Sequence, residues 1–191
     1  MTSPDTLRLF IAINLPEEVK VELARLQQAL EDTEEIRWTP VQQIHLTLKF
    51  LGEVDSASVN DLKAALQRAS AGVKPFVLEA VGVGAFPNLR RPRVLWAGLE
   101  GDLGSLKALQ ERIQHETTAW GRPDDKPFSA HLTIGRVKEG RTPDLRAWSA
   151  RTATMRFGSW QATQIHLMRS VLSPGGATHS EVAVIDLPGL N

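Results

Sequence analysis

Two short stretches of the chain, His45-Leu46-Thr47-Leu48 and His131-Leu132-Thr133-Ile134, carry side chains suited to acid and base chemistry. Successive side chains of a β-strand point to opposite faces, so each stretch would present its histidine and threonine together and bury its aliphatic pair. Because an imidazole has an unperturbed pKa of about 6.5, one copy can serve as general base and the other as general acid near neutral pH. The hydroxyls can donate hydrogen bonds to anionic oxygens. This set predicts chemistry on a phosphoryl group held between the histidines, without a metal ion or another cofactor.

The elements that must position these side chains occur twice. Residues 8–52 and 93–137 each contain an arginine-led apolar strand, an amphipathic helix and one of the two His–Thr stretches. The offset between the copies is 85 residues at the leading arginines, Arg8 and Arg93, and 86 residues at the histidines. A nearly constant offset over three elements predicts two pseudo-equivalent lobes, which would bring the two stretches to a shared cleft.

The rest of the chain adds further helices and strands. Val59, Leu62, Leu66 and Ala69 have the spacing of one buried helix face, and Thr142-Pro143-Asp144 predicts the start of a short helix. Strand-like runs follow at residues 152–157, 164–172 and 181–185, and the turn at 173–176 predicts a hairpin from the last two. Since no linker of low complexity separates the lobes, we expect residues 1–191 to form one domain.

Composition excludes several classes of protein. The 22 basic residues balance the 22 acidic ones, which argues against a protein that grips long nucleic acids through many phosphate contacts. The absence of cysteine excludes thiol nucleophiles, disulfides and thiolate metal sites. The apolar run at residues 9–15 is too short for a membrane span and lacks the features of a signal peptide. We therefore expect a cytoplasmic monomer that does not enter membranes.

Several motifs resemble those of a known family. They are Arg8-Leu9-Phe10-Ile11-Ala12, Trp38 ahead of the run from His45 to Gly52, and the run from Pro127 to Arg136. In order and spacing they resemble the two-histidine (2H) phosphoesterase superfamily, and within it the bacterial and archaeal RNA 2′,3′-cyclic phosphodiesterases, also called 2′-5′ RNA ligases. The resemblance implies a bilobal α+β fold, with antiparallel sheets flanking a cleft and helices outside. It also implies metal-independent hydrolysis of a terminal 2′,3′-cyclic phosphate to a 2′-phosphate, and ATP-independent joining of RNA ends as a related activity.

The same resemblance assigns roles to the four motif residues. It makes His45 the proton donor to the departing 3′ oxygen and His131 the proton acceptor that activates water. It places Thr47 and Thr133 on the phosphate. The pseudo-symmetry of the two halves means that the residues alone do not decide which histidine is the acid and which is the base.

Two further residues match family positions. Arg136 corresponds to an arginine that approaches the phosphate. A regular strand would turn Arg136 toward the core, so this role requires the strand to twist, bulge or end near Gly135, and the alternative is a surface arginine. Phe86 corresponds to a position near the cleft where an aromatic ring can stack on a base, and its alternative is a buried core aromatic.

The chain also departs from the family. Many relatives have a tyrosine after the turn of the C-terminal hairpin, whereas this chain has no tyrosine and places Thr178-His179 there. His115, His166 and His179 lie outside the His–Thr pattern, which favours structural or solvent-exposed roles. The run Arg90-Arg91-Pro92-Arg93 fits either a contact with RNA phosphates or a solvated basic turn.

The partners expected from this set are RNA ends or nucleotides that carry a 2′,3′-cyclic phosphate. Because the motif side chains contact only the phosphate, another small cyclic nucleotide or a 2′-5′ oligonucleotide stays open as the substrate. A non-catalytic binder of RNA ends is the alternative outside enzymes. The alternative without function is that the two stretches are polar residues on the exposed face of an antiparallel sheet. The repetition of the pattern in both halves disfavours this alternative.

Overall fold

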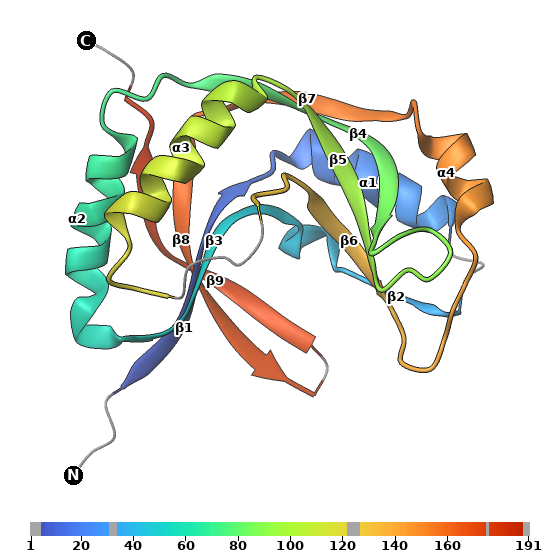
Figure 1. Cartoon of the computed structure of the whole chain (residues 1–191), viewed down its shortest axis with the longest axis horizontal. Coiled ribbons are helices and arrows are strands. Elements are labelled where there is room, and N and C mark those ends of the chain that lie inside the picture. Colours follow the sequence, from blue (N-terminus) through green and yellow to red (C-terminus); the bar gives the residue numbers. More distant parts are fainter. Residues whose placement is uncertain (1–4, 31–33, 122–126, 175, 189–191) are drawn as a thin grey trace.

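The strands form one curled antiparallel sheet (Figure 1). The computed structural model describes residues 5–30, 34–121, 127–174 and 176–188. Within these residues the strand order is β7-β4-β5-β6-β3-β1-β8-β9, and the short β2 pairs with β6. The strands are β1 (Thr6–Asn14), β2 (Ile36–Trp38), β3 (His45–Asp55), β4 (Phe76–Phe86), β5 (Val94–Gly101), β6 (Leu132–Val137), β7 (Arg156–Ala162), β8 (Gln164–Ser173) and β9 (Gly176–Asp186). The predicted α+β class and antiparallel pairing are confirmed.

Helices cover the outside of this sheet (Figure 1). They are α1 (Glu17–Ala29), α2 (Val59–Ser70), α3 (Leu103–Glu116) and α4 (Arg146–Thr152), with short 3-10 turns η1 (Val41–Gln43) and η2 (Ser56–Ser58). Asp102 caps α3 by accepting a hydrogen bond from the backbone N–H of Ser105 at 2.9 Å, which satisfies one of the free donors at the helix start. Within the described residues, none of these helices is long and apolar enough to cross a bilayer.

Two helices pack away from the strands that they follow in the chain. Although α1 follows β1 in the chain, it packs against β7 at the far end of the sheet. In the same way α3 follows β5 but packs against β3 and α2. Most buried apolar side chains of both copies therefore meet in one continuous core, and Phe10, Ala12 and Met168 form a small second cluster.

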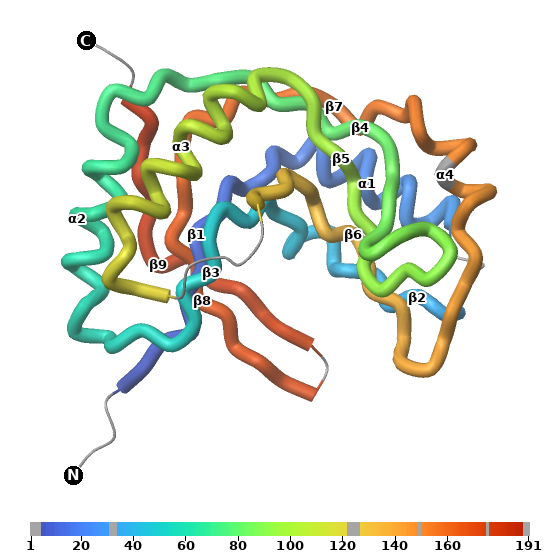
Figure 2. The backbone as a smooth tube through the Cα atoms, viewed as in Figure 1, coloured from blue at the N-terminus to red at the C-terminus, as the bar shows by residue number. Residues whose placement is uncertain are grey.

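Two strands differ from the positions expected from the sequence. β7 begins at Arg156 rather than at Thr152, because Thr152 still belongs to α4 and its hydroxyl donates to the carbonyl of Trp148 at 2.8 Å. β9 begins at Gly176, five residues before Glu181. The predicted hairpin is confirmed, except that Gly175 of its turn lies outside the described residues. The hairpin leaves the rest of the sheet as a two-stranded ribbon (Figure 2).

Candidate active site

The two His–Thr stretches lie side by side at the centre of the sheet. Leu46 of β3 is paired with Leu132 of β6. Because these strands are antiparallel, the same register places His45 beside Thr133 and Thr47 beside His131. Directly opposed residues have Cβ atoms about 4.5–5.5 Å apart, and diagonal neighbours about 7–8 Å. Both imidazoles and both hydroxyls are therefore gathered on one face, within reach of a single phosphate.

Each imidazole is held by the same contact. Nδ1 of His45 lies 2.8 Å from the carbonyl oxygen of Gln43, and Nδ1 of His131 lies 2.7 Å from that of Ser129. A carbonyl oxygen only accepts hydrogen bonds, so Nδ1 carries the proton whether the ring is neutral or charged. The atom that gains and loses a proton in each ring is therefore Nε2. The chain thus builds a histidine clamped by the carbonyl two residues earlier, once in each half.

A bulge in β6 decides the position of Arg136. The pairing of β6 with β5 skips Ile134, so Gly135 as well as Ile134 is buried and Arg136 becomes exposed on the opposite face. Gly135 suits this bulge because a Cβ there would lie 3.0 Å from the side chains of Ile36 and Trp38. The structure thus supplies the irregularity that the sequence required, and Arg136 shares the face of the two histidines.

β3 contains the matching bulge. Its pairing with β1 skips Leu48, so Lys49 turns inward and donates through Nζ to the carbonyl and hydroxyl oxygens of Thr117, both at 2.9 Å. This places a cation at the C-terminal end of α3, where the helix dipole favours it. Phe50 then emerges on the face of His45, with 52% of its surface exposed. Phe50 is the positional counterpart of Arg136, 86 residues apart in the duplicated pattern, and sequence reasoning missed it.

Aromatic rings enclose His45. The ring of Phe10 stacks on it at a centroid distance of 4.7 Å, and the ring of His179 meets it edge-on at 5.1 Å. Burial lowers the pKa of His45 to about 4; the bond to the Gln43 carbonyl opposes this shift, and the positive charge of His179 adds to it. His45 is therefore neutral in the free protein near neutral pH. His179, for which the sequence favours a structural or solvent-exposed role, therefore contacts one of the two motif histidines.

His131 has a different environment. The ring of Phe86 meets it edge-on, with centroids 5.0 Å apart and planes at 88°. Phe86 also lies in one row across the sheet with Val94 and Arg136, since the register pairs Phe86 with Val94 and Val94 with Arg136. The ring of Phe86 is partly exposed, so it is neither a fully buried core residue nor a fully solvent-exposed one. Phe86 therefore lies at the site, in contact with one of the two histidines.

Comparisons with known proteins identify the family of this chain. A family model described as LigT like Phosphoesterase matches residues 13–96 and 101–178. The chain belongs to this family. It is 32% identical over 189 residues to a Thermus thermophilus protein (96% of this chain and 91% of the relative) and 29% identical over 180 residues to one from Archaeoglobus fulgidus (94% and 100%). It is also 35% identical over 133 residues to one from Thermotoga maritima (69% and 71%). All three relatives are named RNA 2′,3′-cyclic phosphodiesterase.

Solved structures of other proteins have the same fold. A crystal structure of a Thermus thermophilus protein matches with a TM-score of 0.80 at 32% identity, covering 97% of this chain and 100% of its own. Escherichia coli LigT complexed with 3′-AMP matches with a TM-score of 0.74 at 24% identity, covering 96% and 99%. The second likeness shows the fold alone. The family and fold expected from the paired motifs are confirmed.

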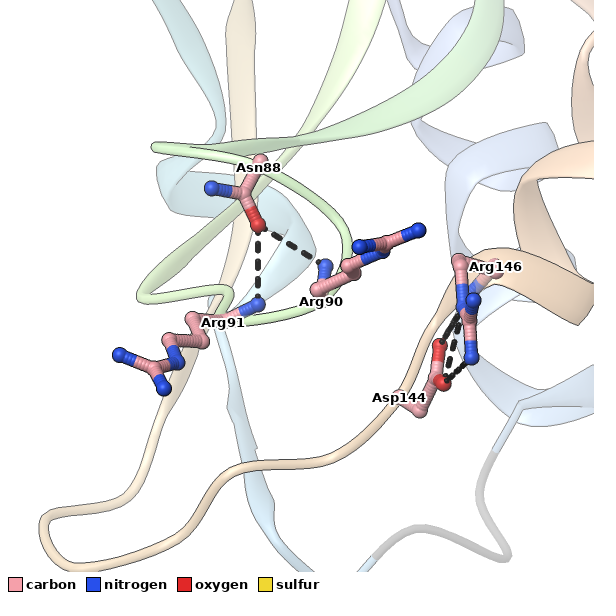
Figure 3. Close-up of polar contacts among 5 residues, drawn as sticks. All are labelled: Asn88, Arg90, Arg91, Asp144 and Arg146. Carbon is pink, nitrogen blue, oxygen red and sulfur yellow. Dashed lines mark hydrogen bonds and ion pairs between the residues drawn. The ribbon is translucent and has the colours of Figure 1, made fainter.

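The remaining histidines and the basic run have the following contacts. Nδ1 of His166 lies 2.8 Å from a carboxylate oxygen of Glu181 on the hairpin, and His115 is an exposed residue of α3. The run after Phe86 forms an exposed turn in which the side chain of Asn88 accepts hydrogen bonds from the backbone N–H groups of Arg90 and Arg91, both at 3.0 Å (Figure 3). The arginines of this turn are exposed.

The contact between His179 and His45 gives a titration prediction. Replacing His179 with alanine removes a neighbouring positive charge and part of the cover over His45. Both changes favour the charged imidazole, so the pKa of His45 is expected to rise from about 4 toward 6.5. Histidine ring resonances followed by NMR against pH provide the measurement. Thr178→Ala, on the same strand and exposed, is the matched control, and an unchanged His45 titration in His179→Ala would contradict the assigned contact.

Proposed function

We propose that this enzyme hydrolyses the 2′,3′-cyclic phosphate at the end of an RNA to a 2′-phosphate. The observation that carries the proposal is the gathering of two imidazoles and two threonine hydroxyls on one face of β3 and β6, each imidazole presenting Nε2. Membership of the LigT-like phosphoesterase family and the names of the relatives support it. We further propose that the enzyme acts as a cytoplasmic monomer.

The reaction follows from the positions of the side chains. The phosphate lies between the rings, and the hydroxyls of Thr47 and Thr133 donate to its non-bridging oxygens as charge develops. Nε2 of His131 takes a proton from water, whose oxygen forms the new bond to phosphorus. Nε2 of His45 gives a proton to the 3′ oxygen as its bond to phosphorus breaks. The guanidinium of Arg136 adds positive charge on the same face.

The low pKa of His45 adds a step to this scheme. His45 is neutral in the free protein, so it must gain a proton before it can act as the acid. A bound phosphate anion beside the ring favours the imidazolium, which raises the pKa of His45 in the complex. Substrate binding is therefore coupled to proton uptake at His45.

The same groups support the joining of RNA ends. A 5′-hydroxyl in the place of water would attack the phosphorus with the help of His131, while His45 protonates the same 3′ oxygen. The product is a 2′-5′ phosphodiester, and no ATP is consumed because the energy comes from opening the cyclic phosphate. We propose that Phe86, which is partly exposed beside His131, stacks on a base of the bound RNA.

Product analysis tests this function. Purified protein with EDTA present is expected to convert nucleoside 2′,3′-cyclic phosphates, and short RNAs that end in them, to 2′-phosphates, which ³¹P NMR distinguishes from 3′-phosphates. A 3′-phosphate product would overturn the proposed regiochemistry. Turnover restricted to other cyclic nucleotides or to 2′-5′ oligonucleotides would favour those substrates. Binding without turnover of any of these compounds would favour the non-catalytic binder.

A further inference from the structure

Two arginines face each other beside the active site. The register between β2 and β6 pairs Arg37 directly with Arg136, and both are exposed. Directly opposed residues of an antiparallel pair share a face, so Arg37 lies on the face that the β6 bulge gives to Arg136. On the other side of the strand pair, Trp38 and Gly135 turn to the core.

Nothing in the described part of the chain neutralises this pair. Like charges directly opposite each other destabilise a sheet, and a carboxylate between them would relieve the repulsion. No ion pair joins either guanidinium to an acidic side chain among residues 5–30, 34–121, 127–174 and 176–188, including Glu35 just before β2. Two exposed guanidinium groups in this arrangement are suited to an anion with several acceptor oxygens.

The position of the pair indicates which anion it would take. Arg136 lies three residues beyond Thr133, or about 10 Å along the strand, and Arg37 lies one strand further, about 4.8 Å to the side. Arg37 is thus further from the reacting phosphate than Arg136. Phe86 belongs to the same row of paired residues, so an aromatic ring lies at the other end of that row. A nucleotide with a second phosphate fits this row better than one with the cyclic phosphate alone.

We propose that Arg37, which lies beside Arg136 and further from the reacting phosphate, binds the phosphate on the 5′ side of the terminal nucleotide, so that the enzyme selects an RNA strand end over a free nucleoside cyclic phosphate. This inference rests on the proposed function and names the part of the substrate that the function leaves open. The asymmetry of the two halves agrees with it, because the counterpart of Arg136 in the first half is the apolar Phe50. The phosphate chain therefore leaves the site over β6 and β2.

Three matched substrates test the proposal. They are adenosine 2′,3′-cyclic phosphate, the same compound with a 5′-phosphate, and a dinucleotide that ends in the same cyclic phosphate. Arg37→Gln is expected to lower kcat/KM by about tenfold for the two substrates with a 5′ phosphate group and by less than about twofold for the first. The dependence of kcat/KM on salt for the dinucleotide should also weaken, with a log–log slope smaller by about 0.7.

The control is Arg25→Gln, which removes one positive charge from the exposed surface of α1. It should change neither kcat/KM for any of the three substrates nor the salt dependence of kcat/KM. The melting temperature of Arg37→Gln should equal or exceed that of the wild type, because the substitution removes a repulsion. An equal loss on all three substrates would overturn the proposal and place Arg37 on the reacting phosphate, and no loss on any of them would also overturn it.

If the wild type turned over no cyclic phosphate, the proposed function would fail. The affinity for a dinucleotide 2′-phosphate, measured by fluorescence anisotropy in wild type and Arg37→Gln, would then still decide whether Arg37 binds the 5′ phosphate.

Discussion

Replacing either His45 or His131 with alanine is expected to lower kcat/KM for a nucleoside 2′,3′-cyclic phosphate by at least about a hundredfold. Each substitution removes an imidazole whose Nε2 transfers a proton in the proposed reaction, while the threonines still bind the phosphate. The loss should therefore fall mainly on kcat. Steady-state kinetics with EDTA present measures it, and the double variant should lose little more than the worse single one if the two rings act as a unit.

The matched control for this experiment is His115→Ala, which changes the same residue type on the exposed side of α3 and should leave kcat/KM unchanged. Circular dichroism of each variant shows whether the sheet is intact. Full activity in either catalytic variant would remove that histidine from the mechanism. In the wild type, kcat reports on the enzyme–substrate complex, where one neutral and one protonated histidine require a bell-shaped dependence of kcat on pH. A flat profile between about pH 5 and 8, with chemistry limiting the rate, would contradict the pair.

The position of the catalytic face could be predicted because it depends on local geometry. Alternation with a period of two puts His45 and Thr47 on one face whatever the rest of the fold does. The duplicated pattern then indicated that the second stretch occupies a related position, and the pairing of Leu46 with Leu132 places the two strands together. Helices with a clear apolar stripe and a capping residue, such as the one that follows Asp102, were predictable for the same local reason.

The bulges could not be predicted from the same pattern. Leu48 and Ile134 are ordinary strand residues, and the skipped pairings arise where β3 and β6 meet their neighbours β1 and β5. Gly135 is the one local signal, since glycine is common at bulges. Regular alternation along β3, without a bulge, would turn Phe50 toward the core together with Leu46 and Leu48. For this reason the pattern does not indicate that the ring of Phe50 is exposed beside the site.

The contact of His179 with His45 could not be predicted for a different reason. This contact joins residues 134 positions apart, and it depends on how the β8–β9 hairpin leaves the sheet, which no local period encodes. The sequence did mark the position, because His179 stands near a tyrosine of many relatives. The aromatic ring of His179 near a position that is often tyrosine in relatives is a sequence signal that this residue lies close to the site.

Removing one threonine hydroxyl is expected to have the second largest effect on catalysis. Thr47→Val and Thr133→Val keep the shape of the side chain and delete the donor to a non-bridging oxygen. Removal of one such donor from a preorganised site costs about a hundredfold in kcat. The register places the two hydroxyls in equivalent positions, so the two losses should be of similar size. Steady-state kinetics on the same cyclic phosphate measures both.

Serine supplies the matched control, because Thr47→Ser and Thr133→Ser restore the hydroxyl and should recover most of kcat. The affinity for the 2′-phosphate product separates two ways in which the hydroxyls could act. If they serve mainly the charge that builds in the transition state, the valine variants lose kcat and bind product nearly as well as the wild type. A loss confined to KM, with kcat unchanged, would mean that the hydroxyls only bind the ground state. The stabilisation of developing charge would then have to come from Arg136 and the protonated histidine.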